Sequence, residues 1–203
     1  MKTKILILIV TLFVIYSSQG GTIIGTPHDL SNRGWGTTET CKFCHTPHAA
    51  KNIVGAPLWN RTLSVATYTL YTSPSFKGAS TQTQPNTPSK LCLSCHDGTV
   101  ALDSYSGNEG NHYMTTSTAI IGGSGKLNRD HPISFDYNAT LVAENRTLVS
   151  PSSTKFVDGA KFIPLYDGKM ECASCHEPHD NDQTKFLRVN NSNSGLCFKC
   201  HIK

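Results

Sequence analysis

All eight cysteines of this 203-residue chain fall in one repeated pattern, in which two cysteines stand three positions apart and a histidine follows the second. The four copies are Cys41-Lys-Phe-Cys44-His45, Cys92-Leu-Ser-Cys95-His96, Cys172-Ala-Ser-Cys175-His176 and Cys197-Phe-Lys-Cys200-His201. C-x-x-C-H is the attachment pattern of c-type haem, in which the thiols bond the porphyrin edge and the adjacent imidazole ligates the iron. The cysteines are therefore the candidate cofactor-binding residues, and the four motif histidines are candidate iron ligands.

Other uses of paired cysteines fit this pattern less well. A zinc site needs four converging ligands and does not require a histidine directly after each pair. A thioredoxin-type pair usually occurs once, and a disulfide framework constrains space rather than sequence neighbours. Histidines after all four pairs would arise by chance roughly a few times in a million. The sequence therefore predicts four covalently attached haem c groups.

The second axial ligand of each iron decides between electron transfer and chemistry at an open site. Nine histidines leave five outside the motifs, so every haem can have two histidine ligands. His48 and His179 are the strongest candidates, because they recur at the same place in C-H-T-P-H and C-H-E-P-H. We expect each to ligate an adjacent haem rather than the haem bound three residues earlier, since the intervening proline directs the ring away.

The next candidates for distal iron ligands are His131 and His28, each beside a proline. The neighbouring acids Asp130 and Asp29 are candidates for orienting the two rings through a hydrogen bond to Nδ1. His112 lies in a polar stretch rich in glycine and asparagine, so a solvent-exposed role is expected and it is a reserve ligand only.

The N-terminus is typical of a secretory signal. Residues 1–4 are basic, residues 5–15 are apolar, and small residues precede position 21. The apolar run is about 11 residues long, whereas a membrane span needs about 20. We expect residues 1–20 to be removed, residues 21–203 to form one tetrahaem domain without a membrane span, and the protein to act outside the cytoplasmic membrane.

Composition predicts how the domain folds. Only 37 % of the residues are hydrophobic, while the chain has 16 glycines and 10 prolines. We expect a mostly irregular chain with short helices and few short strands, wrapped around a stack of four covalently bound c-type haems. The haem surfaces would replace much of a side-chain core, so the haem-free chain should be largely unfolded.

Local patterns place the expected elements along this chain. Each C-x-x-C-H motif should form a helical turn that puts the thiols and the imidazole on one side. Residues 62–72 and 133–141 have the β-branched and aromatic content of short strands, and residues 73–89 read as an exposed loop. Four sequons are candidate glycosylation sites or ordinary polar surface, at Asn60, Asn138, Asn145 and Asn190.

The motifs also indicate an internal duplication. Each C-H-x-P-H copy is followed by a plain motif, which predicts two haem pairs, at residues 41–96 and 172–201. The formal net charge is +4, with no run of basic residues and no nucleic-acid motif. We therefore exclude nucleic-acid binding.

The motif set P-H-D-L-S, C-x-F-C-H-T-P-H, C-L-S-C-H-D-G-T-V-A, D-H-P-I-S-F and C-x-S-C-H-E-P-H resembles the doubled-C-x-x-C-H multihaem cytochromes. More narrowly, it resembles the OmcE-type extracellular tetrahaem cytochromes that polymerise into filaments. That resemblance implies haems with two histidine ligands, a homopolymer with head-to-tail contacts, and one axial histidine supplied by the next subunit. It also implies cell-envelope cytochromes as electron donors and metal oxides or other extracellular acceptors.

The expected function is electron transfer through closely spaced haems, without enzymatic activity. Extracellular conduction along a filament is the leading hypothesis. A soluble periplasmic tetrahaem shuttle, with all distal ligands in the same chain, is the first alternative. A multihaem reductase needs an open haem site, and the surplus of histidines argues against it.

Overall fold

The computed structural model describes residues 22–53, 55–78, 84–152, 155–158 and 161–202, so the leader predicted at residues 1–20 lies outside them. Most described residues lie in turns and irregular segments. The helices are α1 Thr87–His96, α2 Ala139–Glu144 and α3 Cys172–Cys175, and the strands are β1 Phe135–Asp136, β2 Lys155–Asp158, β3 Lys161–Pro164 and β4 Lys169–Met170. Short 3-10 turns cover Ser31–Arg33, Thr40–Phe43, Gly123–Gly125, Thr184–Phe186, Ser192–Ser194 and Cys197–Lys199. The predicted loop-rich class with short helices and few strands is confirmed.

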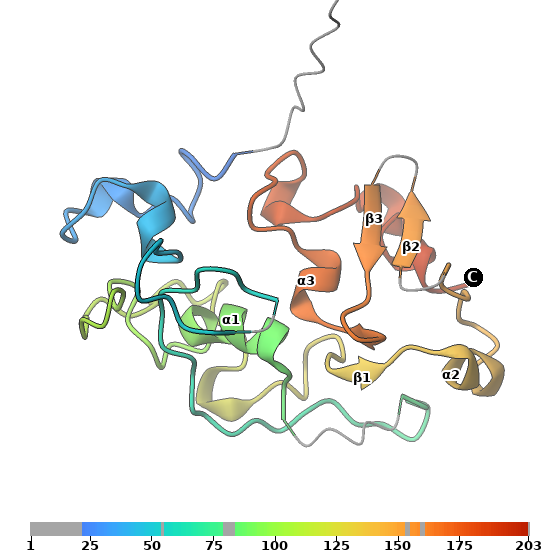
Figure 1. Ribbon diagram of the computed structural model, residues 1–203. Helices are drawn as coiled ribbons and strands as arrows, with labels where there is room; N and C mark the ends of the chain where they lie inside the picture. Colours follow the sequence, from blue (N-terminus) through green and yellow to red (C-terminus); the bar gives the residue numbers. More distant parts are fainter. Residues whose placement is uncertain (1–21, 54, 79–83, 153–154, 159–160, 203) are drawn as a thin grey trace, which may run out of the picture.

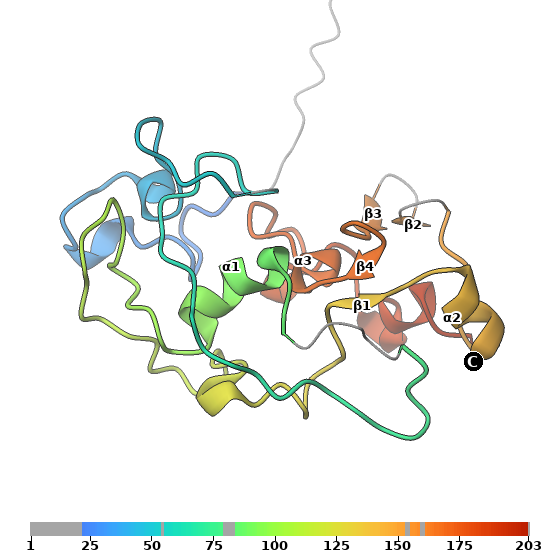
Figure 2. The ribbon, with the colours of Figure 1, turned by 60° about the horizontal axis from the view of Figure 1, so that its bottom comes forward.

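The two halves of the chain meet at two helices that carry haem motifs. Figures 1 and 2 both show α1, from the second motif, beside α3, from the third. The strands form two small antiparallel sheets, in which β1 pairs with β4 and β2 pairs with β3. Both sheets lie in the C-terminal half of the chain (Figure 1). The fold is therefore a set of loops anchored on a central helix pair.

The apolar core is divided and small. One cluster joins the sheets to α2 and consists of Phe135, Tyr137, Leu141, Leu148, Phe156, Ile163, Leu165, Met170 and Val189. A second cluster contains only three buried residues, Tyr68, Leu93 and Leu127. Burial of apolar surface is the main favourable term in folding. These two clusters therefore contribute little hydrophobic stabilisation to the N-terminal half of the chain.

A buried carboxylate joins the two central helices. Glu171, at the N-terminus of α3, is only 1 % exposed. Its Oε2 accepts hydrogen bonds from Ser89 Oγ of α1 at 2.5 Å and from Ser134 Oγ at 2.9 Å. Its Oε1 accepts from Asn86 Nδ2 at 2.8 Å. Three polar side chains from two distant segments thus depend on one glutamate.

A buried guanidinium similarly fixes the first motif to the chain after the second. Arg61 is 2 % exposed. Its Nη1 donates to the carbonyl oxygens of Phe43 at 3.1 Å and Leu102 at 2.9 Å, and its Nη2 donates to that of Ala101 at 2.6 Å. Unpaired buried carbonyls are costly, so this side chain stabilises both loops at once.

The strand predicted at residues 62–72 is not formed. Side chains, rather than a neighbouring strand, bond much of this backbone. Gln84 accepts from Tyr68 N at 2.8 Å and donates to Tyr68 O at 3.1 Å, while Ser94 Oγ accepts from Ser64 N at 3.3 Å. A single bridge, between Thr69 and Lys126, gives the segment its only strand-like pairing in the described chain.

Two other local predictions are correct only in part. Within residues 133–141 the strand is limited to β1, because Asn138 Oδ1 accepts from Leu141 N at 3.0 Å and begins α2. The loop predicted at residues 73–89 gives way to α1 at Thr87, and Ser89 is fully buried rather than exposed. Part of that loop, residues 79–83, lies outside the described residues.

One sequon cannot be ordinary polar surface. Asn60 is 5 % exposed, and its Nδ2 donates to the carbonyl oxygen of Lys42 at 2.8 Å and to Ser106 Oγ at 3.1 Å. A glycan at this position would break these bonds.

We expect the haem-free chain to lack a cooperative fold. The small, divided core does not compensate for the conformational entropy of so many irregular residues. Expression without haem attachment should give a chain with no cooperative thermal transition in circular dichroism, whereas the haem-loaded protein should show one. A cooperative transition of the haem-free chain would contradict this expectation.

Glu171→Ala should lower the free energy of unfolding of the haem-loaded protein by about 3 kcal/mol or more, because it leaves several buried donors unpaired. Urea unfolding measures the loss. The control is Asp136→Ala, which removes an exposed partner of Lys169 and should cost roughly 0–1 kcal/mol. Equal losses in both variants would show that the buried network does not stabilise the fold.

Candidate haem-binding site

Each haem motif lies on a short helical turn, as predicted from the sequence. The first covers the turn Thr40–Phe43, the second ends α1, the third forms α3, and the fourth covers Cys197–Lys199. In the first, third and fourth motifs the histidine N–H donates to the carbonyl oxygen of the first cysteine, at 2.9, 3.1 and 2.9 Å. This bond closes one helical turn and groups the two thiols with the imidazole.

Backbone carbonyls fix the protonation of three motif histidines. In each case Nδ1 lies within hydrogen-bond distance of a carbonyl oxygen, namely Pro57 for His45 (2.9 Å), Ala119 for His96 (2.7 Å) and Lys185 for His176 (2.8 Å). A carbonyl oxygen only accepts, so Nδ1 carries the proton. The lone pair then lies on Nε2, where a metal ligand needs it.

Three motif histidines each face a second imidazole from a distant part of the chain. The pairs are His28 with His96, with ring centres 6.1 Å apart and planes at 82°, His45 with His179, at 6.1 Å and 27°, and His131 with His201, at 6.4 Å and 77°. A metal–imidazole bond is about 2 Å long and the ring centre lies roughly 1 Å beyond the nitrogen. Two imidazoles on opposite faces of one iron thus have centres about 6 Å apart, which these pairs match.

The pairing connects segments far apart in the sequence. His179 faces His45 of the first motif, although it stands three residues after His176 of the third. His28 precedes the first motif but faces His96 of the second. The three pairs bring together six of the eight residues predicted as iron ligands, and ligation itself stays a prediction.

The three distal imidazoles, of His28, His131 and His179, differ in the group that contacts Nδ1. His131 Nδ1 lies 2.9 Å from the carbonyl oxygen of Pro132, and His179 Nδ1 lies 2.9 Å from Glu177 Oε1. His28 Nδ1 is buried and has no hydrogen-bond partner among the residues that the structure describes, and its ring stacks on Phe186 with centres 4.5 Å apart. Packing therefore orients His28, while a hydrogen bond orients the other two rings.

The acids predicted to orient the distal rings do not do so. Asp29 instead accepts from Ser31 Oγ at 2.6 Å and from Gly25 N at 2.8 Å, which folds its own turn. His131 uses the carbonyl of the next residue rather than Asp130. Glu177, which does orient the His179 ring, was not predicted from the sequence. The signal was present in C-H-E-P-H, where an acid stands two residues before the histidine.

Burial keeps two distal imidazoles neutral. Burial, helped by the nearby His96, His179 and His176 rings, lowers the pKa of His28 to about 4. Burial also lowers the pKa of His131. A histidine must be neutral to ligate a metal, so both rings are ready to do so at neutral pH. The rings that act on His28 are the motif histidines His96 and His176, of the second and third motifs, together with His179.

The attachment thiols of consecutive motifs are neighbours. A hydrogen bond joins the Cys92 and Cys172 thiols, raising the pKa of Cys92 and lowering that of Cys172. Burial, together with a nearby thiol of the next motif, raises the pKa of Cys44 and that of Cys175 to about 11. The thiol of the next motif is Cys95 for Cys44 and Cys197 for Cys175. The haem edges bonded at these thiols would therefore lie side by side in the order of the motifs.

Three histidines remain outside the facing pairs. His176 belongs to the third motif, but no imidazole of the described residues faces it in the same way. His48 is exposed. His112 is engaged locally, with Nδ1 2.7 Å from Asp103 Oδ2 and its ring 4.7 Å from that of Trp35. The described chain thus has one motif histidine, His176, that no distal imidazole faces, and two exposed histidines, His48 and His112, that face no motif histidine.

Residues 164–203 match the family model of the doubled CXXCH motif. This segment contains α3 and the third and fourth motifs. No curated protein matches the chain. The match indicates a multihaem c-type cytochrome with covalently bound haem and a role in electron transfer.

Among the described residues, no three side chains of His, Cys, Asp or Glu gather as a metal-ion cage requires. All eight cysteines lie in the described part of the chain, and none of them forms a disulfide. In that part, no helix has the length and apolar character needed to cross a bilayer.

His131→Ala should remove one axial ligand from the haem of the fourth motif. We expect a high-spin component in the visible spectrum and carbon monoxide binding by that haem after reduction. His112→Ala is the matched control and should leave the spectrum low-spin. A fully low-spin His131→Ala protein would show that the facing pair does not share an iron.

Proposed function

We propose that this chain is a secreted tetrahaem cytochrome c that carries electrons and assembles head to tail into an extracellular filament. The facing imidazole pairs are the observation that carries the proposal, because their spacing suits an iron with two histidine ligands. A bound haem c supplies the one-electron change between ferric and ferrous iron. Metal oxides or other extracellular acceptors would receive the electrons, and cell-envelope cytochromes would donate them.

The chain's own residues would hold and isolate the haems. Each facing imidazole pair would hold one haem iron from two sides and so exclude water and substrate from it. The adjacent thiols of consecutive motifs would hold neighbouring haem edges together. These roles favour electron transfer over catalysis, and we propose that the protein is not an enzyme.

His48 and His176, which belong to none of the facing pairs, support assembly between copies. We propose that His48 of one copy ligates the haem bound at His176 of the next. His48 is exposed and occupies the same place in its C-H-x-P-H motif as His179, whereas His112 is bonded to Asp103. A contact between two different surfaces of the same chain is heterologous, and such contacts produce open polymers.

A multihaem reductase is the second candidate, and one observation favours it. The haem at His176 would have an open face if no histidine of another copy reached it. Such a haem is high-spin and binds added ligands such as cyanide, whereas a closed one does not.

His48→Ala should abolish filaments and leave one high-spin haem in each subunit. Electron microscopy and visible spectroscopy of the same secreted, haem-loaded fraction measure both effects. His112→Ala is the control and should leave filaments and low-spin spectra unchanged.

Other outcomes of this experiment separate the functions. Low-spin filaments of His48→Ala would overturn the assignment of the shared ligand. A wild-type monomer with only low-spin haems would indicate the soluble shuttle. A wild-type monomer with one high-spin haem that binds cyanide would indicate the reductase.

A further inference from the structure

One distal histidine is bonded to a charged acceptor. Glu177 Oε1 lies 2.9 Å from His179 Nδ1 and also accepts from His179 N at 3.2 Å. The Nδ1 atoms of His45, His96, His131 and His176 lie instead against neutral backbone carbonyls. The two faces of the first motif's haem would therefore differ, with a carboxylate behind one ligand and a carbonyl behind the other.

A carboxylate behind an imidazole makes it a stronger electron donor. It attracts the Nδ1 proton and raises the basicity of Nε2, which stabilises ferric over ferrous iron. We propose that Glu177 is a positioning residue that lowers the reduction potential of the haem held between His45 and His179. This inference rests on the proposed function, because it requires His179 to ligate that haem.

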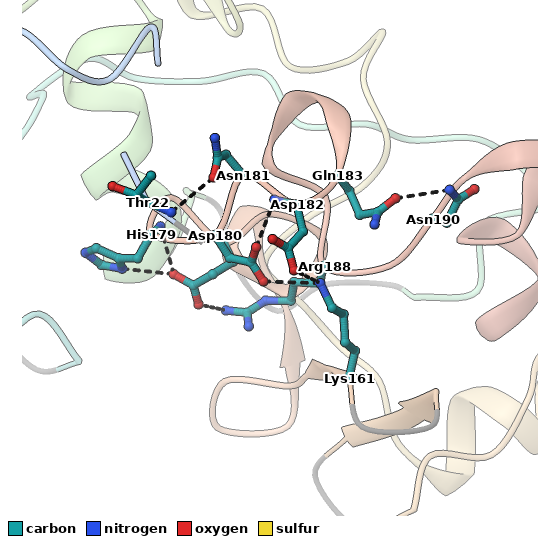
Figure 3. Close-up of polar contacts among 10 residues, drawn as sticks. Thr22, Lys161, His179, Asp180, Asn181, Asp182, Gln183, Arg188 and Asn190 are labelled. Atoms are coloured by element: carbon teal, nitrogen blue, oxygen red, sulfur yellow. Dashed lines mark hydrogen bonds and ion pairs between the residues drawn. The ribbon is translucent and has the colours of Figure 1, made fainter. Parts of the chain in front are cut away.

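Arg188 holds the carboxylate in place. Its Nη2 lies 2.9 Å from Glu177 Oε2, whereas both contacts with His179 are made by Oε1. Arg188 is itself fixed, since its Nε donates to the carbonyl oxygen of Ala173 at 2.7 Å and its Nη2 to Tyr166 Oη at 3.2 Å. In Figure 3, dashed lines run from the His179 ring and from the Arg188 guanidinium to the same carboxylate.

The loop that follows His179 is anchored on both sides. Lys161 of β3 lies 3.3 Å from Asp180 and 3.0 Å from Asp182 (Figure 3). Thr22 N donates to Asn181 Oδ1 at 3.0 Å. These contacts hold the loop beside Glu177 and so support the position of the His179 ring against the carboxylate.

The duplication provides an internal comparison. Thr46 stands in the first C-H-x-P-H copy where Glu177 stands in the second. Thr46 Oγ1 donates to the carbonyl oxygen of His48 at 2.9 Å, so no carboxylate from that position lies behind the His48 ring. The C-H-x-P-H turn therefore forms with a threonine as well as with a glutamate. The glutamate stands in the copy whose histidine, His179, faces His45.

The ring planes give a spectroscopic means of identifying this haem. The His45 and His179 planes are 27° apart, whereas the other two pairs are at 82° and 77°. Near-parallel axial imidazoles give a rhombic low-spin electron paramagnetic resonance signal, and near-perpendicular ones give a highly anisotropic signal. The rhombic signal thus distinguishes the haem of the first motif from those of the second and fourth.

The test is a redox titration of the haem-loaded protein followed by electron paramagnetic resonance, in wild type and Glu177→Gln. Glu177→Gln should shift the reduction equilibrium of one rhombic component roughly tenfold toward ferrous iron. That shift raises the reduction potential by about 59 mV for one electron. Glu177→Thr, which places the residue of the first copy in the second, should raise the same potential. This variant replaces Glu177→Gln in the test if the glutamine variant fails to fold.

Asp103→Asn is the matched control, because it neutralises a carboxylate on the Nδ1 of His112, which faces no motif histidine. It should leave every potential unchanged. An unshifted rhombic component in both Glu177 variants, or an equal shift of all haems, would overturn the inference.

His179→Ala separates this inference from the proposed function. If His179 is a ligand, that variant loses the rhombic signal and gains a high-spin one. If it does so while the Glu177 variants show no shift, only the role of Glu177 fails. If His179→Ala leaves every rhombic component in place and adds no high-spin signal, the proposed ligation itself fails.

Discussion

Facing imidazole pairs that join distant segments are the feature on which the proposed haem site depends. The ring centres of His45, from the N-terminal half, and His179, from the C-terminal half, lie 6.1 Å apart, so an iron held between them would link the two halves. Few apolar side chains make that connection, since the buried residues of the larger core cluster all come from the C-terminal half and Phe76 packs against it from the N-terminal half. Buried polar side chains such as Glu171 and Arg61 then hold the motif helices and loops in register around these pairs.

The duplicated C-H-x-P-H segment has two different roles in one chain. Its second copy places His179 opposite His45 within the chain, while its first copy leaves His48 exposed. A duplicated ligand with one partner inside and one outside is suited to joining successive copies. The difference between Thr46 and Glu177 then gives the two copies different electronic surroundings as well.

Much of the chemistry could be predicted from sequence, because c-type haem attachment needs contiguous residues. The helical turns at the motifs and the loop-rich class follow from the same local patterns. The pairing of His28 with His96 could not be predicted, since it depends on tertiary contacts such as the stacking on Phe186. The strand expected at residues 62–72 failed because side chains such as Gln84 bond its backbone, and no alternating pattern reveals that.

An electron cryo-microscopy map of the haem-loaded protein tests the central claim most directly. The account predicts one iron between the rings of each facing pair, at His28 and His96, His45 and His179, and His131 and His201. It also predicts that the iron at His176 is ligated by His48 of the neighbouring copy. A map in which two facing histidines bind different irons, or in which His176 has its distal ligand from its own chain, would contradict the account.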